Sequence, residues 1–368
     1  VVAVGGCYAE AQRDRIFERY AFVDVAFGPG TIHHLGEWLG AGGLGVARSA
    51  FGTADERRFS AVLATHRERG FQAWVQISMG CNSVCSYCIV PAVRGREVSR
   101  RPGEILAEVT ALAREGVREV TLLGQNVNSW GRDLLPDNRT EFGELLRAVN
   151  DVDGIDRIRF TSPHPKDFRA PVIAAMAECD AVCEHAHLPL QSGSTRVLKR
   201  MRRTYGRERY LRLVGELRAT IPDLAITTDL IVGFPGETDS DFEETCSAVE
   251  EVGFDGAFTF VYSPRSGTEA AAMLDQVPDE VKHERIERLV DVVQHVAAER
   301  NARRVGLTEE VLVEGPSRTD TALLRGRTRR NVTVNFDGSA MAGELVPVRI
   351  TASTSHTLHG RQEALVAA

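Results

Sequence analysis

Short apolar runs alternate with longer stretches of helical periodicity through most of the chain. Between residues 71 and 304, six runs rich in β-branched residues predict strands at 75–78, 120–123, 158–160, 188–190, 225–232 and 257–262. Helical patterns follow most of them, including 104–115, 141–149, 239–252 and 279–304. Because such alternation is typical of a parallel sheet covered by helices, six repeats predict an α/β fold, a partial (βα)6 barrel.

The segments on either side of this repeat have different patterns. The pattern of residues 1–40 predicts a strand at 1–4, a helix at 10–20 and a strand at 23–27, which we interpret as the remnant of an N-terminal α/β domain that begins upstream. Residues 41–69 are rich in Gly, Ala and Arg and indicate a linker, in which the apolar run 59–63 could dock. We therefore divide the chain into 1–40, 41–69, 70–304 and 305–368.

The last segment changes to β-branched runs that are broken by Gly and Asp. These runs predict strands at 310–313, 323–326, 331–336 and 345–350. Four short strands with turn residues between them are typical of a small all-β barrel.

Composition narrows the possible class of protein. Apolar residues make up 43% of the chain, yet no apolar run approaches the roughly 20 residues that span a bilayer. Seven cysteines, an odd number, favour metal or redox use over a disulfide framework. We expect a cytoplasmic protein that makes no membrane contact. The net charge of -7 argues against a general coat for nucleic acid, although the basic residues are clustered.

Polar residues are concentrated in the loops that follow the predicted strands. Active sites of parallel α/β barrels lie at the carboxyl ends of the strands, so these loops predict a single mouth. The loops are the cysteine-rich segment 81–88 and the segments 124–126, 162–165, 191–194, 233–237 and 263–267.

Cys81, Cys85 and Cys88 form a C-x3-C-x2-C loop. Three thiolates at this spacing can bind three irons of a four-iron four-sulfur cluster and leave the fourth iron without a protein ligand. A structural zinc site usually needs four ligands in two pairs, and no second pair with that spacing follows. Three other cysteines are expected to pack in the core: Cys179 and Cys183, four apart on a predicted helix, and Cys246 on another helix.

Longer motifs carry a family resemblance. The run MGCNSVCSYCIVP at 79–91 resembles the core of the radical S-adenosylmethionine (SAM) methylthiotransferases. LGQNVNSW at 123–130 resembles the branch of that family that acts on tRNA. The match continues through TSPHP, LPLQSGS, DLIVGFPGE and YSPRSGT, and it covers nearly the whole chain.

The resemblance implies the cofactors and their ligands. A four-iron four-sulfur cluster on Cys81, Cys85 and Cys88 would cleave SAM to a 5'-deoxyadenosyl radical. The implied SAM contacts are Tyr87 beside the adenine, Gly124, Gln125 and Asn126 at the methionine end, and Ser162, Gln191 and Asp229 at the ribose or amino-acid part. Gln125 and Asn126 have the alternative of capping the following helix.

The resemblance also implies a second four-iron four-sulfur cluster in an N-terminal domain. Cys7, in a Gly-Cys-Tyr-Ala turn, resembles the third of its three cysteine ligands. We expect the other two ligands upstream of residue 1, so the chain as numbered cannot assemble that site by itself.

The activity implied by the family is methylthiolation of carbon 2 of N6-isopentenyladenosine beside the tRNA anticodon. One SAM would yield the radical and a second would donate the methyl group, with an electron donor protein as partner of a monomeric enzyme. Two other targets remain open, a threonylcarbamoyl-modified adenosine and a ribosomal-protein aspartate. A further alternative is a non-enzymatic RNA-binding module whose cluster is structural.

Basic clusters and the last domain point to RNA. The C-terminal segment resembles a TRAM domain, and its predicted phosphate contacts are Arg318, Arg325, Arg327, Arg329 and Arg330. Two more basic runs lie at 94–101 and 196–209, although solvated helix faces are a common alternative. The target base of the anticodon stem-loop must leave its stack to reach a buried radical.

Four histidines lack the sequence pattern of a metal site, and we expect polar core or surface roles for them: His185, His187, His356 and His359.

Overall fold

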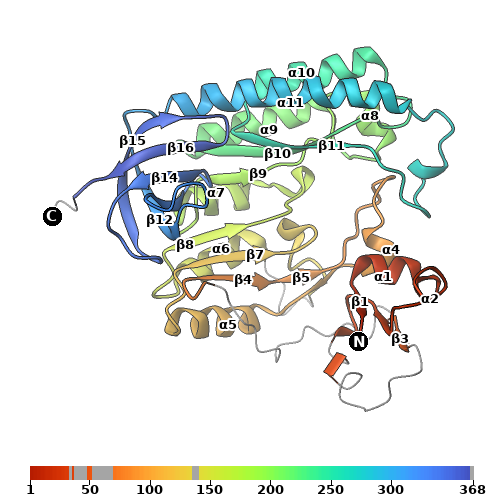
Figure 1. Cartoon of the computed structure of the whole chain (residues 1–368), viewed down its shortest axis with the longest axis horizontal. Helices are drawn as coiled ribbons and strands as arrows, with labels where there is room; N and C mark the ends of the chain where they lie inside the picture. The colour runs from red at the N-terminus through yellow and green to blue at the C-terminus, as the bar shows by residue number, and fades with distance from the viewer. Residues whose placement is uncertain (33–34, 37–47, 52–68, 135–140, 365–368) are drawn as a thin grey trace.

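A computed structural model describes residues 1–32, 35–36, 48–51, 69–134 and 141–364, which form three units (Figure 1). These are a small N-terminal sheet, a central open barrel and a small C-terminal barrel. The apolar run 59–63 and most of the predicted linker lie outside the described residues.

The N-terminal unit is a three-stranded parallel sheet with two short helices. Its strands are β1 (Ala3–Gly5), β2 (Val25–Phe27) and β3 (Arg48–Ala50), and its helices are α1 (Cys7–Gln12) and α2 (Arg15–Arg19). The single helix predicted at 10–20 is wrong, because Arg13 adopts a left-handed φ of 49° and separates α1 from α2. β3 lies inside the segment predicted to be a linker, so this sheet continues past residue 40.

The central unit confirms six parallel strands. They form two three-stranded sheets, β4 (Gln72–Gln76), β7 (Glu119–Leu123) and β8 (Arg157–Phe160), then β9 (His185–His187), β10 (Ala225–Val232) and β11 (Gly256–Val261). A parallel bridge between Ile158 and Val182 joins the two sheets. Within the described residues β4 and β11 each pair on one side only, so they are the two lateral edges of an open barrel.

The fourth strand lies earlier in the chain than predicted. We expected it at 188–190, but it covers His185–His187. The chain still follows β10 beyond β9, since the Leu188 amide donates to the Thr227 carbonyl at 2.7 Å. Pro189 has no amide hydrogen and the Leu190 amide donates to the Thr228 hydroxyl instead, so the regular ladder ends.

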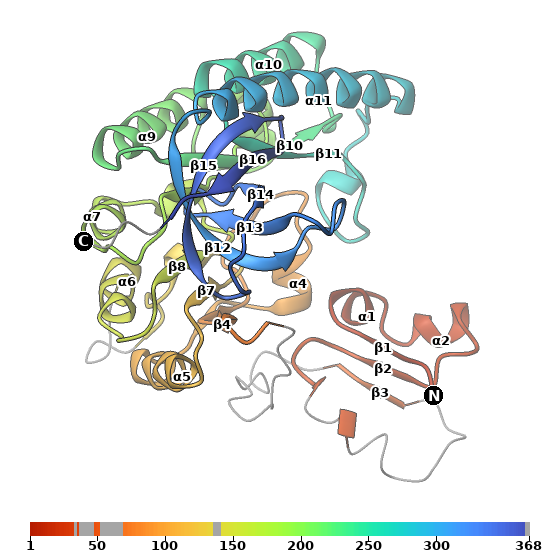
Figure 2. The same ribbon diagram turned by 60° about the vertical axis from the view of Figure 1, so that its left-hand side comes forward.

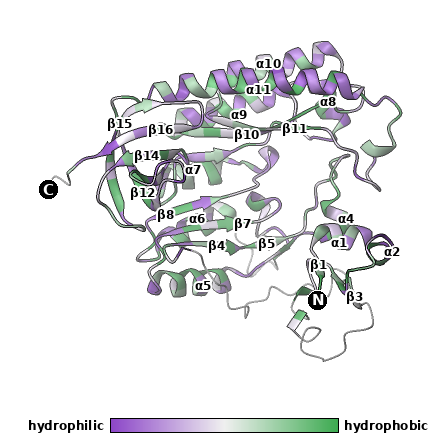
Figure 3. Cartoon of the chain, in the orientation of Figure 1, coloured by the Kyte–Doolittle hydropathy of each residue, from purple (hydrophilic) through white to green (hydrophobic). Residues whose placement is uncertain are grey.

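Helices cover the outside of the barrel (Figure 2). They are α5 (Pro102–Arg114), α6 (Phe142–Asn150), α7 (Ala170–Glu178), α8 (Thr195–Arg200), α9 (Arg207–Thr220), α10 (Asp239–Val252) and α11 (Asp279–Ala302). Four match the predicted ranges closely, and α7, α8 and α9 complete the set. α10 and α11 carry both polar and apolar residues along their length (Figure 3), as expected for helices with one face on a core. None of the described helices has the combined length and apolarity that a membrane crossing requires.

Short elements connect these layers. They are β5 (Ser78–Met79), β6 (Val98–Ser99), α4 (Val90–Arg94) and the 3₁₀ helices η3 (Val127–Ser129), η5 (Pro165–Asp167) and η6 (Ala270–Ala272). The three remaining cysteines are buried, which confirms core packing for Cys179, Cys183 and Cys246. Cys179 and Cys183 do not share a helix, because α7 ends at Glu178.

The C-terminal unit is a closed barrel of five strands in the order β12-β13-β14-β16-β15. The strands are β12 (Thr308–Pro316), β13 (Leu324–Thr328), β14 (Thr333–Asp337), β15 (Leu345–Ser353) and β16 (Thr357–Gln362). The sequence predicted the first four. β16 was missed because it offers one fully buried apolar side chain, Leu358, and its parallel pairing with β14 depends on closure of the barrel.

The C-terminal barrel packs on the amino ends of the central strands, on the side opposite the cysteine loop (Figure 1). Arg157, at the start of β8, is fully buried and donates to the carboxylate of Glu310 at 2.9 Å. Arg329 forms an ion pair of 2.7 Å with Glu184, just before β9. The carboxyl ends of the strands therefore remain available for the cysteine loop.

Candidate active site

The cysteine loop begins at the end of β5, above the carboxyl ends of β4 and β7. Gly80 turns the chain with a φ of 76°, and a Cβ atom there would overlap the carbonyl oxygen of Arg96. Only glycine fits this position without strain. The Cys81 amide then donates to the Gly95 carbonyl at 3.1 Å, and the Cys88 amide donates to the Cys85 carbonyl at 3.1 Å. These bonds hold the backbone that carries the three thiols.

The three cysteines of the loop carry free thiols. Cys81, Cys85 and Cys88 are all half-buried and unpaired. No group of three potential ligands converges on one point anywhere in the described part of the chain. A four-iron four-sulfur cluster would take one thiolate on each of three irons, and its binding by Cys81, Cys85 and Cys88 stays a prediction. The Ser83 amide also donates to the Cys81 sulfur at 3.4 Å, a contact that stabilises a thiolate.

A charged hydrogen-bond chain lies behind the loop. The guanidinium of Arg203, half-buried, lies 3.8 Å from the Cys85 sulfur and 2.6 Å from Nε2 of His164. Burial, together with the charges of Arg203 and Lys166, lowers the pKa of His164 to about 2, so the imidazole is neutral and accepts from Arg203. Lys166 donates to the Ser83 hydroxyl at 3.0 Å. Two cations thus adjoin the cysteine loop, where they would offset the negative charge of a thiolate-bound cluster.

Tyr87 stands between Cys85 and Cys88 in the sequence and packs against a small apolar cluster. Its ring meets Phe234 edge to face with centroids 6.2 Å apart, and burial raises the pKa of its hydroxyl. The neighbouring Ser86 hydroxyl donates to the Arg200 carbonyl at 2.8 Å. These contacts tie the cysteine loop to the end of α8. The predicted contact of Tyr87 with adenine stays a prediction.

The turn after β7 supports the cysteine loop directly. The side-chain oxygen of Gln125 accepts a hydrogen bond of 2.6 Å from the Gly80 amide. Gly124 approaches so closely that a Cβ there would lie 2.5 Å from the Ser78 hydroxyl oxygen. Asn126 is buried and donates to Asp167 at 2.7 Å, while its own side-chain oxygen has no hydrogen-bond partner among the described residues. The structure thus brings these residues to the mouth, and their contact with SAM stays a prediction.

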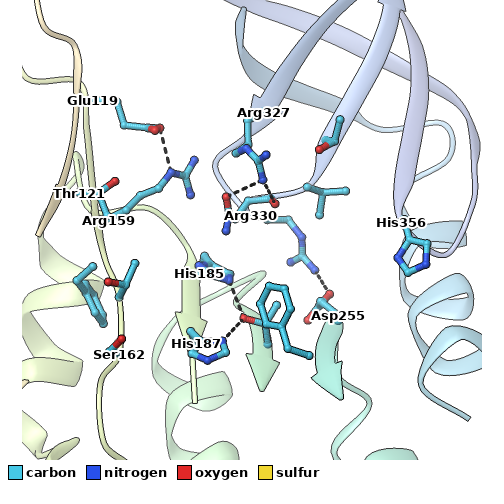
Figure 4. A pocket seen from close by; sticks show the side chains of 18 of the residues that line it. Glu119, Thr121, Arg159, Ser162, His185, His187, Asp255, Arg327, Arg330 and His356 are labelled. Atoms are coloured by element: carbon cyan, nitrogen blue, oxygen red, sulfur yellow. Dashed lines mark hydrogen bonds and ion pairs between the residues drawn. The ribbon is translucent and has the colours of Figure 1, made fainter. Parts of the chain in front are cut away.

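A cavity of about 1150 Å³ runs through the barrel from the C-terminal unit toward the mouth (Figure 4). Two of the predicted SAM contacts line it, Ser162 after β8 and Asp229 on β10. Gln191 is buried, and its backbone amide donates to the backbone carbonyl of Asp229 at 2.8 Å. Ser162 and Gln191 both have a positive φ, 58° and 74°, so the chain turns sharply where it leaves the barrel.

A polar line follows β9 and β10 inside this cavity (Figure 4). Ring nitrogens of His185 and His187 each lie 3.0 Å from the Thr227 hydroxyl oxygen, and His187 lies 3.3 Å from Asp229. Burial lowers the pKa of His185, so this imidazole is neutral. Both residues therefore have the polar interior role that the sequence suggested.

Known proteins match the chain over nearly its whole length. The Radical SAM superfamily model matches residues 75–249 and the TRAM domain model matches residues 302–362. The tRNA-2-methylthio-N(6)-dimethylallyladenosine synthase of Salinispora arenicola is 49% identical over 99% of the chain and 74% of the relative. The chain belongs to this synthase family. Synthases of Mycobacterium marinum and a Thermoanaerobacter species are 48% and 46% identical, over 97% and 98% of the chain and 71% and 77% of the relatives.

In this member of the synthase family, the N-terminal unit lies beside the cysteine loop. Cys7 begins α1, which packs on α4, the helix that follows the loop. Nε of Arg94 on α4 lies 3.2 Å from the Cys7 sulfur. The predicted role of Cys7 as a ligand of a second cluster stays a prediction.

The arginines predicted to contact RNA have carboxylate partners in four of five cases. Arg325 and Arg327 contact Glu314, Arg329 contacts Glu184, and Arg330 contacts Asp255, at 3.3, 3.4, 2.7 and 2.6 Å. Arg318 is exposed. The run at 196–209 behaves similarly, with ion pairs from Arg196, Arg200, Arg202 and Arg207. Their binding of phosphate stays a prediction, and the structure shows that ion pairs already engage most of them.

Several side chains at the site were not singled out from the sequence. Arg203 appeared only as part of a basic run, and His164 only as part of a polar loop. Trp74 and Phe258 line the cavity; the sequence pattern predicts Phe258 as an ordinary strand residue, and Trp74 lies just before the strand predicted at 75–78. The alternation of side chains along β4 and β11 could have identified both residues. Trp74 and Phe258 point to the side of the strand opposite the positions that face the helices.

Proposed function

We propose that this chain methylthiolates carbon 2 of N6-isopentenyladenosine beside the anticodon of tRNA. The observation that carries the proposal is the sequence similarity to the synthase of Salinispora arenicola, 49% identity over 99% of the chain and 74% of the relative. The cysteine triplet lies at the mouth of the barrel. The enzyme would act in the cytoplasm as a monomer, with an electron donor protein as a second partner.

The bound cofactors supply the reactive species, since a reduced cluster and SAM together generate the 5'-deoxyadenosyl radical. The chain itself positions them. Gln125 and Gly80 fix the loop that would hold the cluster, and Arg203 and Lys166 place positive charge beside it. The helices cover the outer face of the barrel, and the C-terminal unit covers the amino ends of its strands (Figure 1, Figure 2).

The first test concerns the cluster and its chemistry. Anaerobically reconstituted and reduced protein should release 5'-deoxyadenosine from SAM. A Cys81→Ala, Cys85→Ala, Cys88→Ala variant should lose that product together with the visible iron-sulfur absorption, because the three thiolates are the only proposed protein ligands of this cluster. Cys246→Ala is the matched control, since Cys246 is a buried core thiol on α10. To remove any iron held at Cys7, the iron content is measured in the triple variant with Cys7 replaced as well. Unchanged iron content in that variant would refute the assignment.

The second test concerns the target. Mass spectrometry of tRNA from a strain lacking the gene should show N6-isopentenyladenosine without the methylthio group. Accumulation of unmodified threonylcarbamoyladenosine, or of an unmodified ribosomal-protein aspartate, would assign the enzyme to another branch. Release of no 5'-deoxyadenosine under any condition would favour an RNA-binding module with a structural cluster.

A further inference from the structure

Three large aromatic side chains line the barrel cavity and are exposed to it. They are Trp74, Phe258 and Phe260, which expose 69%, 64% and 50% of their surface. Large aromatic side chains that remain exposed within a concave site are typical of ligand-binding surfaces. We refer to these three residues as the aromatic edge.

The aromatic edge lies along the two sides of the barrel opening. Trp74 is on β4 and the two phenylalanines are on β11, the strands that end the two sheets. On β11 both phenylalanines face the interior, because they alternate with Ala257 and Thr259. Phe258 pairs in register with Asp229, and Phe260 pairs with Ile231 toward the cysteine-loop end of the barrel. The apolar surface therefore runs from the middle of the cavity toward the mouth.

Charge in the cavity favours an uncharged ligand beside the phenylalanines. The Asp229 carboxylate is the neighbour of Phe258 on β10, and the His187 ring lies 6.1 Å from that of Phe258. The arginines among the described lining residues have carboxylate partners, namely Arg69 and Arg327 with Glu314, Arg159 with Glu119, and Arg330 with Asp255. A ligand that carries its own carboxylate would meet Asp229 without an unpaired cation to compensate it.

We propose that the aromatic edge is the recognition site for the extruded N6-isopentenyladenine, with Phe258 and Phe260 packing against the branched alkenyl chain. The inference rests on the proposed function and names the residues that select the substrate. Aromatic side chains stack on bases that have left the RNA helix, and an alkenyl group gains from burial against phenylalanine. The neighbouring Asp229 disfavours the anionic threonylcarbamoyl group, so the same surface separates the two candidate adenosines.

The experiment compares two RNA hairpins with the sequence of an anticodon stem-loop, one with N6-isopentenyladenosine and one with plain adenosine. Binding to the reconstituted chain is measured by fluorescence anisotropy. The wild-type chain should prefer the isopentenyl hairpin by on the order of tenfold, the discrimination that a small apolar group allows. A Phe258→Ala, Phe260→Ala variant should reduce that ratio to near one, and Phe258→Leu, Phe260→Leu should retain part of it.

A matched variant and folding controls accompany the comparison. Phe22→Ala removes an exposed phenylalanine from the N-terminal unit, 67% exposed, and should leave the ratio unchanged. The thermal midpoint and iron content of each variant report whether the barrel is intact. A third hairpin with threonylcarbamoyladenosine should bind the wild-type chain more weakly than the isopentenyl hairpin.

The outcomes separate the inference from the proposed function. If the wild-type chain prefers the isopentenyl hairpin and folded alanine variants keep that preference, the aromatic edge is not the recognition site. Stronger binding of the threonylcarbamoyl hairpin would overturn the charge argument. If the wild-type chain neither distinguishes the isopentenyl hairpin nor methylthiolates it, the proposed function itself fails.

Discussion

At the scale of single residues, the site depends on groups whose charge is set by their neighbours. Arg203 contacts the Cys85 sulfur on one side and His164 on the other. The low pKa of His164, about 2, keeps it an acceptor at neutral pH. Hydrogen bonds and positive charge near the sulfurs of a cluster raise its reduction potential, because reduction adds negative charge.

Replacement of Arg203 should therefore lower the midpoint potential of the cluster. For Arg203→Gln we expect a shift of about -60 mV, which corresponds to one hydrogen bond of about 1.4 kcal/mol in a one-electron couple. A redox titration followed by electron paramagnetic resonance measures it, and Arg203→Lys should shift the potential less. Arg209→Gln is the control, since Arg209 is exposed and donates to the Thr204 carbonyl at 3.3 Å. An unchanged potential in Arg203→Gln would show that the guanidinium does not act on the cluster.

His185 should make the barrel sensitive to mild acid. Burial and the positive charge of Arg159 hold the pKa of His185 well below 6.5 in the folded chain. The unfolded chain then binds one more proton below about pH 6.5, so stability falls as the pH falls through that value. The thermal midpoint should drop between pH 7.5 and 5.5 in the wild-type chain and drop less in His185→Gln. His283→Gln, at an exposed site on α11, should behave like the wild-type chain.

At the scale of elements, α10 is fixed by its first turn. The Thr238 hydroxyl accepts from the Asp241 amide, and the Thr238 amide donates to Asp241 at 2.8 Å, which forms a capping box. Asp241 also accepts from the Ser194 hydroxyl at 2.6 Å. Burial raises the pKa of Asp241, but hydrogen bonds from Arg196, Ser194 and Thr238 outweigh it and lower the pKa below its usual value. The cap thus joins α10 to the loop that precedes α8.

Replacement of either capping residue should lower the free energy of unfolding, by a smaller amount for Thr238 than for Asp241. Thr238→Ala should cost about 1 kcal/mol of unfolding free energy, the usual value for an N-cap. Asp241→Ala should cost more, about 2–3 kcal/mol, because it leaves several buried donors without an acceptor. Urea denaturation followed by circular dichroism measures both. Ser240→Ala, at an exposed position in the same turn, is the control, and equal losses in all three variants would contradict the capping argument.

At the scale of the whole molecule, ion pairs of two buried arginines hold the C-terminal barrel against the central one. Arg157 and Arg330 extend across the contact to Glu310 and Asp255, and both arginines are buried (Figure 4 shows the second pair). The contact closes the amino ends of the central strands and leaves the mouth to the cysteine loop. Arg329 and Arg330, which the sequence suggested as phosphate contacts, therefore form ion pairs between the two domains.

Removal of one such arginine should loosen the C-terminal unit. In Arg330→Met the buried Asp255 keeps Arg300 as its one ionic partner among the described residues, and breaking a buried pair costs about 3 kcal/mol. Calorimetry should show a separate, earlier transition for the C-terminal unit, together with faster proteolysis near residues 303–307. Arg361→Met, on the exposed side of the same unit, should melt like the wild-type chain. A single unchanged transition in Arg330→Met would show that the pair does not hold the domains.

Local pattern by itself determined most of the helices and strands and the position of the cysteine loop. β10 and α10 have the predicted bounds, because period-two and helical periodicity are strong there. The thiol spacing predicted a cluster loop at Cys81, Cys85 and Cys88, and the structure places these residues at the mouth of the barrel. The prediction failed where long-range contacts compete with pattern: Arg13 breaks the first helix, Pro189 ends the ladder after β9, and β16 needs a closed barrel to form.

Tertiary structure alone decided which charged and aromatic residues act together. Arg203 reaches Cys85 across a separation of 118 residues, and Arg330 reaches Asp255 across 75. Exposure of Trp74 and Phe258 inside the barrel also depends on how the two sheets close. A sequence shows which groups are charged or apolar, but their partners and burial arise from distant segments, because folding brings together residues that no local pattern connects.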